Sequence, residues 1–182
     1  MIEFLTALTV AAQAAVVAYL VLRLVELLGG SRRPLDAVAR TIGRDSLKLA
    51  WLVSAMAMFG SLWMSEHLHF IPCPLCWYQR IAMYPLVLLL GIAAIRRDES
   101  IRSYAIPLAL VGSVVSIYHY QLERFPDQQS IACSVSVPCT TIWFEKLGYI
   151  TIPMMALSAF ALVVVILIVG GRDHGQGIAR EA

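Results

Sequence analysis

The sequence predicts an all-α integral membrane protein: a four-helix transmembrane bundle preceded by one extra N-terminal transmembrane helix. Hydrophobic residues make up 59% of the 182 residues and charged residues 14%, and the mean hydropathy is +0.75. A soluble domain of this length has too little interior to bury so much apolar surface. The composition therefore excludes a soluble enzyme and a disordered chain, and the net charge of +2 is too small to indicate a nucleic-acid partner.

Five apolar runs approach or exceed the roughly 20 residues that cross a bilayer. Each must be helical, because hydrocarbon cannot satisfy an open backbone. The second run is short, but Trp51 and Trp63 near its ends fit an interfacial aromatic belt. Pro85, Pro107 and Pro153 are compatible with helices here, since neighbouring helices can satisfy the freed carbonyls. The expected spans are Phe4–Leu28, Leu49–Met64, Trp77–Ile95, Tyr104–Leu122 and Ile150–Val169.

The first apolar run could instead be a signal peptide, but no Lys or Arg precedes it and it is longer than a signal's apolar core. We therefore expect a retained helix. In the connector that follows, Leu35, Val38 and Ile42 recur at helical spacing, which indicates either a short surface helix or a plain charged connector. The expected organisation is 1–48 for the extra helix and cytoplasmic connector, 49–170 for the four-helix domain and 171–182 for a loose cytoplasmic tail.

The positive charges predict the orientation, because Lys and Arg collect in cytoplasmic loops. Ten of the fourteen lie in the connector, after the third span and in the tail. We therefore expect the N-terminus outside, the C-terminus inside and all four cysteines on the outer face, where disulfides are permitted. The ten residues are Arg32, Arg33, Arg40, Arg44, Lys48, Arg96, Arg97, Arg102, Arg172 and Arg180.

Cys73-Pro-Leu-Cys76 lies at the outer start of the third span. C-x-x-C spacing suits a reversible redox disulfide, and a helix N-terminus lowers the pKa of a thiol. The thiolate is the nucleophile in disulfide exchange. The alternative is a zinc site completed by His67, His69 or the other two cysteines, although no second close ligand pair completes such a set in the sequence.

Cys133 and Cys139 form a second pair in the long outer loop. They are either a static disulfide that stabilises the loop or a second, exposed exchange pair. Two pairs on one face of a membrane, with no other catalytic set, indicate a relay in which electrons enter at the loop and pass to the helix pair. The rival class is a structural membrane subunit with two inert disulfides.

Arg80 follows Cys76 by one helical turn, on the same face. An arginine in a membrane span is costly, so it either extends to the headgroups or supplies a fixed charge that stabilises a thiolate and an anionic reduced cofactor. His119, in the sequence Y-H-Y-Q at the outer end of the fourth span, titrates near neutrality and can move protons. Considered alone, it reads as an interfacial histidine between tyrosines.

These motifs resemble those of the DsbB/BdbC family of bacterial membrane oxidoreductases, which make disulfides for proteins of the export compartment. The resemblance rests on C-P-L-C-W-Y-Q-R at 73–80, Y-H-Y-Q-L at 118–122, the following loop with two cysteines, and W-F-E-K-L-G-Y-I-T-I-P at 143–153. It covers about residues 45–172. The extra first helix is a departure from the family pattern, and its role stays open.

The resemblance implies a four-helix bundle in the bacterial cell membrane with a bound quinone, either ubiquinone or menaquinone. By analogy, Cys76 faces the quinone, Arg80 and His119 lie beside it, and Cys73 exchanges with the loop pair. Vitamin K epoxide reductases share this bundle, but there the loop pair precedes the C-x-x-C, whereas here it follows.

The resemblance also implies a soluble partner, a thioredoxin-like oxidase of the DsbA type. Cys133 corresponds to the loop cysteine that the partner attacks, and Cys139 to its resolving mate. The two are only six positions apart, closer than in some members and nearer to the BdbC style of loop. Membrane lipid is the other expected partner.

The predicted orientation can be tested with reporters. A reporter that works only in the cytoplasm should be active when fused after Ala182 and inactive when inserted near Gln128, because the ten positive charges place the C-terminus inside. The measurement is reporter activity in cells, normalised to the amount of each fusion. The reverse pattern would place the cysteines on the wrong side of the membrane for disulfide formation.

Overall fold

The computed structural model describes residues 1–128, 133 and 137–181. Ser134, Val135 and Ser136 of the cysteine loop lie outside these residues. Within them the fold is helical and contains no β-strand, apart from one isolated bridge between Lys146 and Ile150. The helices are α1 (Ile2–Leu27), α2 (Arg33–Ile42), α3 (Ser46–Glu66), α4 (Pro74–Arg96), α5 (Arg102–Arg124) and α6 (Ile152–Glu181).

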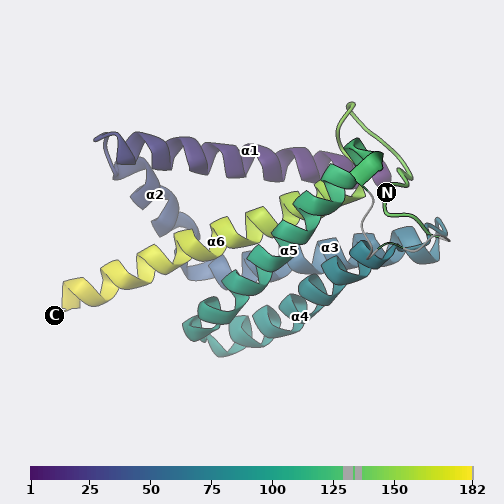
Figure 1. The fold of residues 1–182 in the computed structure, drawn as a ribbon. Coiled ribbons are helices and arrows are strands. Elements are labelled where there is room, and N and C mark those ends of the chain that lie inside the picture. The colour runs from purple at the N-terminus through teal and green to yellow at the C-terminus, as the bar shows by residue number, and fades with distance from the viewer. Residues whose placement is uncertain (129–132, 134–136, 182) are drawn as a thin grey trace.

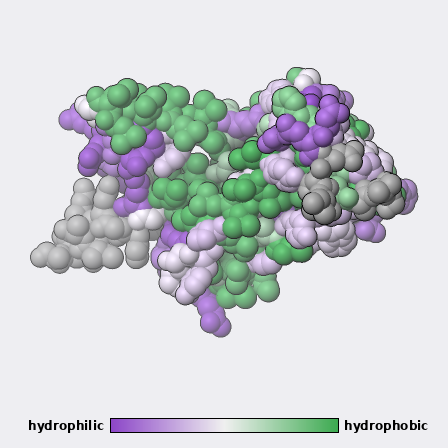
Figure 2. Space-filling model, in the orientation of Figure 1, coloured by the Kyte–Doolittle hydropathy of each residue, from purple (hydrophilic) through white to green (hydrophobic). Residues whose placement is uncertain are grey.

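Five helices in the described residues are long and apolar enough to cross a membrane, as expected: α1, α3, α4, α5 with its preceding turn, and the first 21 residues of α6. They lie roughly side by side (Figure 1). The N-terminus and the connections from α3 to α4 and from α5 to α6 lie at one end, and α2 and the C-terminus lie at the other. Figure 2 shows apolar surface over α1 and the middle of the bundle and hydrophilic residues toward both ends. The all-α membrane fold is therefore confirmed.

The core of the bundle lies where α3, α4, α5 and α6 meet. Leu86 and Leu90 of α4 and Phe160 and Leu167 of α6 are completely buried there. Gly112 of α5 faces Phe160 so closely that a Cβ at this position would overlap the aromatic ring. Small residues at helix crossings allow such close approach, which supplies the packing that holds membrane helices together.

The extra helix α1 continues through a turn into α2, and both pack against α6. Leu35 and Ala39 of α2 are buried, so the connector is a helix, as the spacing of its apolar residues indicated. Near the end of α1, Glu26 forms ion pairs with Arg23, with Arg32 at 3.2 Å and with Arg172 of α6 at 3.2 Å. These ion pairs connect the C-terminal end of α1 to α6.

One expectation about the chain's end is wrong. The segment after residue 170 was expected to be loose, but α6 continues as a helix to Glu181. The apolar sequence ends near Val169, but the helix continues beyond it. Backbone hydrogen bonds can extend a helix without apolar side chains.

The contact between α5 and α6 generates a stability prediction. Gly112→Ala should lower the stability of the bundle by about 1–3 kcal/mol, because the added methyl group overpacks the site against Phe160. Thermal unfolding in detergent measures the effect. Gly171→Ala is the matched control, since its nearest side-chain atom lies 3.7 Å away in ordinary contact. Equal melting temperatures for the two variants would contradict this packing.

Candidate functional site

The C-x-x-C motif lies across the start of α4. Cys73 is the N-cap residue with an extended backbone, and its Sγ accepts a hydrogen bond from the backbone N–H of Cys76 at 3.3 Å. Pro74 occupies the first helical position, where its fixed φ and missing N–H are tolerated. The two cysteines are free thiols, with their Sγ atoms 3.1 Å apart. This spacing leaves only a short movement to disulfide formation.

His119 contacts the sulfur of Cys73, the first cysteine of this pair. Its Nε2 lies 3.5 Å from Cys73 Sγ, and the side chain is buried, with 2% exposed. The hydrogen bond from the Cys76 thiol, reinforced by His119, holds the pKa of Cys73 well below its usual range despite the opposing effect of burial. Cys73, which lies just outside the membrane-spanning part of α4, is therefore the cysteine favoured as a thiolate.

The loop cysteines lie next to the helix pair. Cys133 and Cys139 are joined by a disulfide. Cys139 is buried in a cluster with Cys73, Leu75 and Leu122, and half-buried Cys133 packs against that cluster. Two cysteine pairs that are about 60 residues apart in the sequence thus meet at the N-terminal end of α4 and the C-terminal end of α5.

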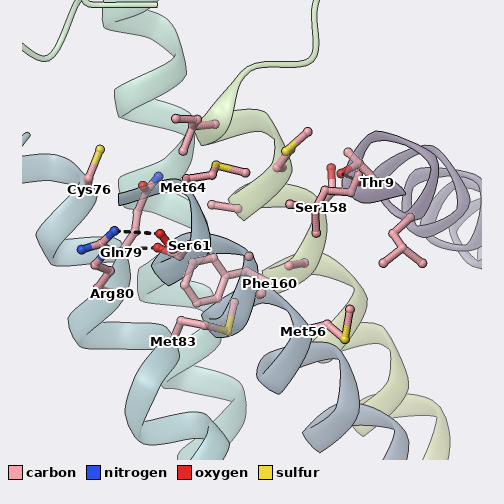
Figure 3. A pocket seen from close by; sticks show the side chains of 18 of the residues that line it. Thr9, Met56, Ser61, Met64, Cys76, Gln79, Arg80, Met83, Ser158 and Phe160 are labelled. Atoms are coloured by element: carbon pink, nitrogen blue, oxygen red, sulfur yellow. Dashed lines mark hydrogen bonds between the residues drawn. The ribbon is translucent and has the colours of Figure 1, made fainter. Parts of the chain in front are cut away.

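Arg80 points across to α3 rather than out to the headgroups. Its Nε donates a hydrogen bond to Ser61 Oγ at 3.0 Å, and its Nη2 donates to Ser61 O and Ser65 Oγ, both at 3.0 Å (Figure 3). The guanidinium also lies 5.3 Å from the ring centroid of Trp77. These contacts keep a positive charge inside the bundle, one turn below Cys76.

A cavity of about 280 Å³ opens between α1, α3, α4 and α6. Cys76, Gln79 and Arg80 line one end of it, and apolar side chains such as Met83 and Phe160 line most of the rest (Figure 3). Pockets for small molecules begin at about 300 Å³ and combine apolar walls with a few polar groups. This cavity therefore fits the ring of an apolar molecule held beside a thiol and a fixed positive charge.

The structure separates two residues that the sequence placed at one cofactor. Arg80 and Cys76 line the cavity, whereas His119 is absent from the described residues of its lining and contacts Cys73 instead. The Cys73–Cys76 pair lies between Arg80 and His119. His67 stacks on Trp63 with 3.9 Å between ring centroids. Among the described residues, the ligand atoms that gather at the thiols belong to Cys73, Cys76 and His119.

Two buried polar residues of the site escaped the sequence analysis. Gln79 donates a hydrogen bond to Ser116 Oγ at 2.9 Å, which links α4 to α5 between the thiols and the core. Glu123 is buried one turn after His119, and its Oε2 has no hydrogen-bond partner among the described residues. A carboxylate at the end of an apolar span is itself a signal that could have identified Glu123.

The contact between His119 and Cys73 generates a prediction for pH dependence. In the reduced protein, Cys73 should ionise to the thiolate with a pKa well below that of an ordinary cysteine. His119→Ala should raise this pKa by about one unit, because the variant loses a favourable partner of the charged form. Ultraviolet absorbance of the thiolate, followed against pH, measures the shift. His67→Ala should leave the titration unchanged, and an unshifted titration in His119→Ala would contradict the assignment.

Comparisons with known proteins place the chain in a family. The family model for "Disulfide bond formation protein DsbB" matches residues 43–170. Disulfide bond formation protein C from Bacillus subtilis is 46% identical over 122 residues, 66% of this chain and 88% of that protein. A probable disulfide formation protein from Oceanobacillus iheyensis is 42% identical over 132 residues, 71% of this chain and 91% of that protein.

A third relative, the probable disulfide formation protein C 2 from Bacillus anthracis, is 41% identical over 126 residues, 69% of this chain and 90% of that protein. No solved structure gives a significant match. The matched region contains all four cysteines, Arg80 and His119. The chain therefore belongs to the DsbB family of disulfide bond formation proteins, as its motifs indicated.

Proposed function

We propose that this protein reoxidises a DsbA-type thioredoxin-like protein outside the cytoplasm and passes the electrons to a membrane quinone. The observation that carries the proposal is the position of the Cys73–Cys76 pair, with the loop disulfide on one side and the apolar cavity on the other. The ten positive charges expected on the inner side support a location in the bacterial plasma membrane with the cysteines facing outward.

The first exchange takes place at the loop. A thiolate of the reduced partner attacks Cys133, the S–S bond to Cys139 breaks, and Cys139 leaves as a thiolate. The second thiol of the partner then attacks its own sulfur in the mixed disulfide. The partner leaves with a new disulfide, and the loop retains two thiols. Half-buried Cys133 is a more accessible sulfur for this attack than buried Cys139.

The second exchange passes the electrons to α4. The loop thiols reduce the oxidised Cys73–Cys76 pair and recover their own disulfide. The shared apolar cluster of Cys139 and Cys73 supports this step, since it brings the two pairs into one packed region. His119 stabilises the Cys73 thiolate that this exchange releases.

The last step returns the pair on α4 to a disulfide. The two thiols lose two electrons and two protons, and a bound quinone would supply the two-electron acceptor and leave as quinol. Cys76 lines the cavity, so its sulfur is the one that faces the acceptor. Arg80 supplies a charge that is permanent at neutral pH and offsets the cost of negative charge in a poorly hydrated site.

Redox potentials are consistent with this direction of flow. DsbA-type proteins are strong oxidants, near −120 mV, so the terminal acceptor must be more oxidising still. For a two-electron transfer, a gap on the order of 100 mV corresponds to about 5 kcal/mol. A quinone pool can supply such a gap.

One observation favours a second candidate, metal binding. The ligand atoms of Cys73, Cys76 and His119 all lie within 4.8 Å of one another. Thiolate and imidazole groups are the ligands that zinc prefers. Metal analysis of the purified, reduced protein separates the two functions: one bound zinc, lost in Cys73→Ser and accompanied by no quinone reduction, would favour the metal site.

Substitutions in the two cysteine pairs should block different steps of the proposed cycle. Cys139→Ser removes the loop disulfide, so its lone Cys133 thiolate should form a mixed disulfide only with the oxidised form of an added DsbA-type protein, by attacking the partner's disulfide and releasing one partner thiol. Cys73→Ala should still exchange with the partner at the loop but should stop quinone turnover. Non-reducing gels and quinone absorbance measure the two outcomes. Normal turnover by the loop variants would make the loop disulfide a static one.

Arg80 should affect the quinone step only. Arg80→Ala should raise the KM for quinone and slow its reduction by about 10²-fold, an effect typical of losing one preorganised electrostatic donor. Arg80→Lys should recover only part of the rate, because lysine lacks the planar fork. Loop exchange with the partner is the internal control and should stay unchanged. Steady-state kinetics with varied quinone measure these effects. If the kinetics of Arg80→Ala match those of the wild type, Arg80 has only a structural role as a link between α3 and α4.

A further inference from the structure

We propose that the extra helix α1 is a wall of the quinone cavity, and that Leu5 seated on Gly60 of α3 closes this wall toward the lipid. The inference rests on the proposed function, because it assigns the occupant of the same cavity. It concerns a part of the chain that precedes the family match at residues 43–170. Leu5, Leu8, Thr9 and Ala12 of α1 nevertheless line the cavity together with α3, α4 and α6.

The burial pattern of α1 supports this role. Its buried residues, which include Leu5, Thr9 and Ala12, all lie in the first half of the helix, at the level of the cavity. In the second half, large apolar side chains face outward: Val17 is 57% and Leu20 56% exposed. The half of α1 that contains its buried residues is therefore the half that lines the cavity.

The approach of α1 to α3 depends on a glycine. A Cβ at Gly60 would lie 3.1 Å from both Leu5 Cδ1 and Leu5 Cδ2, tighter than ordinary contact. Both residues line the cavity. The absence of a side chain at position 60 therefore lets the leucine of α1 reach α3 and complete the enclosure on that side.

Polar contacts hold this half of α1 in place. Gln13 Nε2 donates a hydrogen bond to Ser158 Oγ of α6 at 3.1 Å, and Gln13 Oε1 accepts one from Tyr149 Oη at 2.8 Å. Lys146 Nζ forms an ion pair with Glu3 at 2.5 Å. In Figure 3, Thr9 and Ser158 lie across the cavity from Arg80 and Cys76, so α1 forms the wall opposite the thiol.

This arrangement has a consequence for the ligand. Without α1, the cavity between α3 and α6 would be open to lipid, and rings of different size could enter. With Leu5 in place, the cavity of about 280 Å³ is near the lower limit for small-molecule pockets. We therefore expect the ring of a bound quinone to contact α1.

The first test is photolabelling of the full-length protein in detergent. A photoreactive azido-benzoquinone should label α1 within the tryptic fragment 1–23, and excess unlabelled benzoquinone should prevent the labelling. Mass spectrometry of the digest identifies the labelled fragment. Labels confined to α3, α4 and α6 would overturn the inference, whatever the activity of the protein.

The second test compares two substitutions in α1. Leu5→Ala should weaken binding of a benzoquinone about tenfold. Val17→Ala is the matched control, because Val17 lies on the same helix and is exposed toward lipid. Equal affinities in the two variants would overturn the role of α1 while leaving quinone reduction intact. Wild-type protein that neither binds nor reduces quinone would instead overturn the proposed function.

Discussion

The start of α4 between Cys73 and Cys76 is the constraint on which the rest of the site depends. Because Cys73 is the N-cap and Cys76 lies in the first turn, the two sulfurs are close to each other but belong to different surroundings. Cys73 faces His119 and the loop disulfide, and Cys76 faces the cavity. One helix terminus therefore connects the loop disulfide to an apolar cavity within the bundle.

Burying a polar side chain inside a membrane bundle costs free energy. The hydrogen-bond partners of these side chains indicate the role of each. Arg80 and Gln79 are each bonded to serines of a neighbouring helix, so they position the site while joining α4 to α3 and α5. His119 Nδ1 and Glu123 Oε2 are buried without a hydrogen-bond partner among the described residues. Buried groups of this kind are rare in structural roles, and here they lie one helical turn apart beside the Cys73 thiol.

Hydropathy and spacing predicted the spans, the helix after the first span and the C-x-x-C at a helix start, because each depends on neighbours in the sequence. They could not predict contacts between helices, such as Arg80 with Ser61 or His119 with Cys73, since these depend on how helices rotate against one another. In helix α1, Thr6, Thr9 and Gln13 recur at helical spacing on the face that meets the bundle, a signal that the apolar residues alone do not give. The family resemblance named candidate site residues but gave no expectation for α1, which it does not cover.

In the proposed cycle, the Cys73–Cys76 pair, and not the loop pair, delivers electrons to quinone. The most direct measurement is an anaerobic titration of the prereduced protein in which both loop cysteines are replaced, Cys133→Ser and Cys139→Ser. We expect one quinol formed per protein, with loss of the two free thiols on α4. The absence of quinol, or free thiols that persist after quinone is consumed, would contradict the claim.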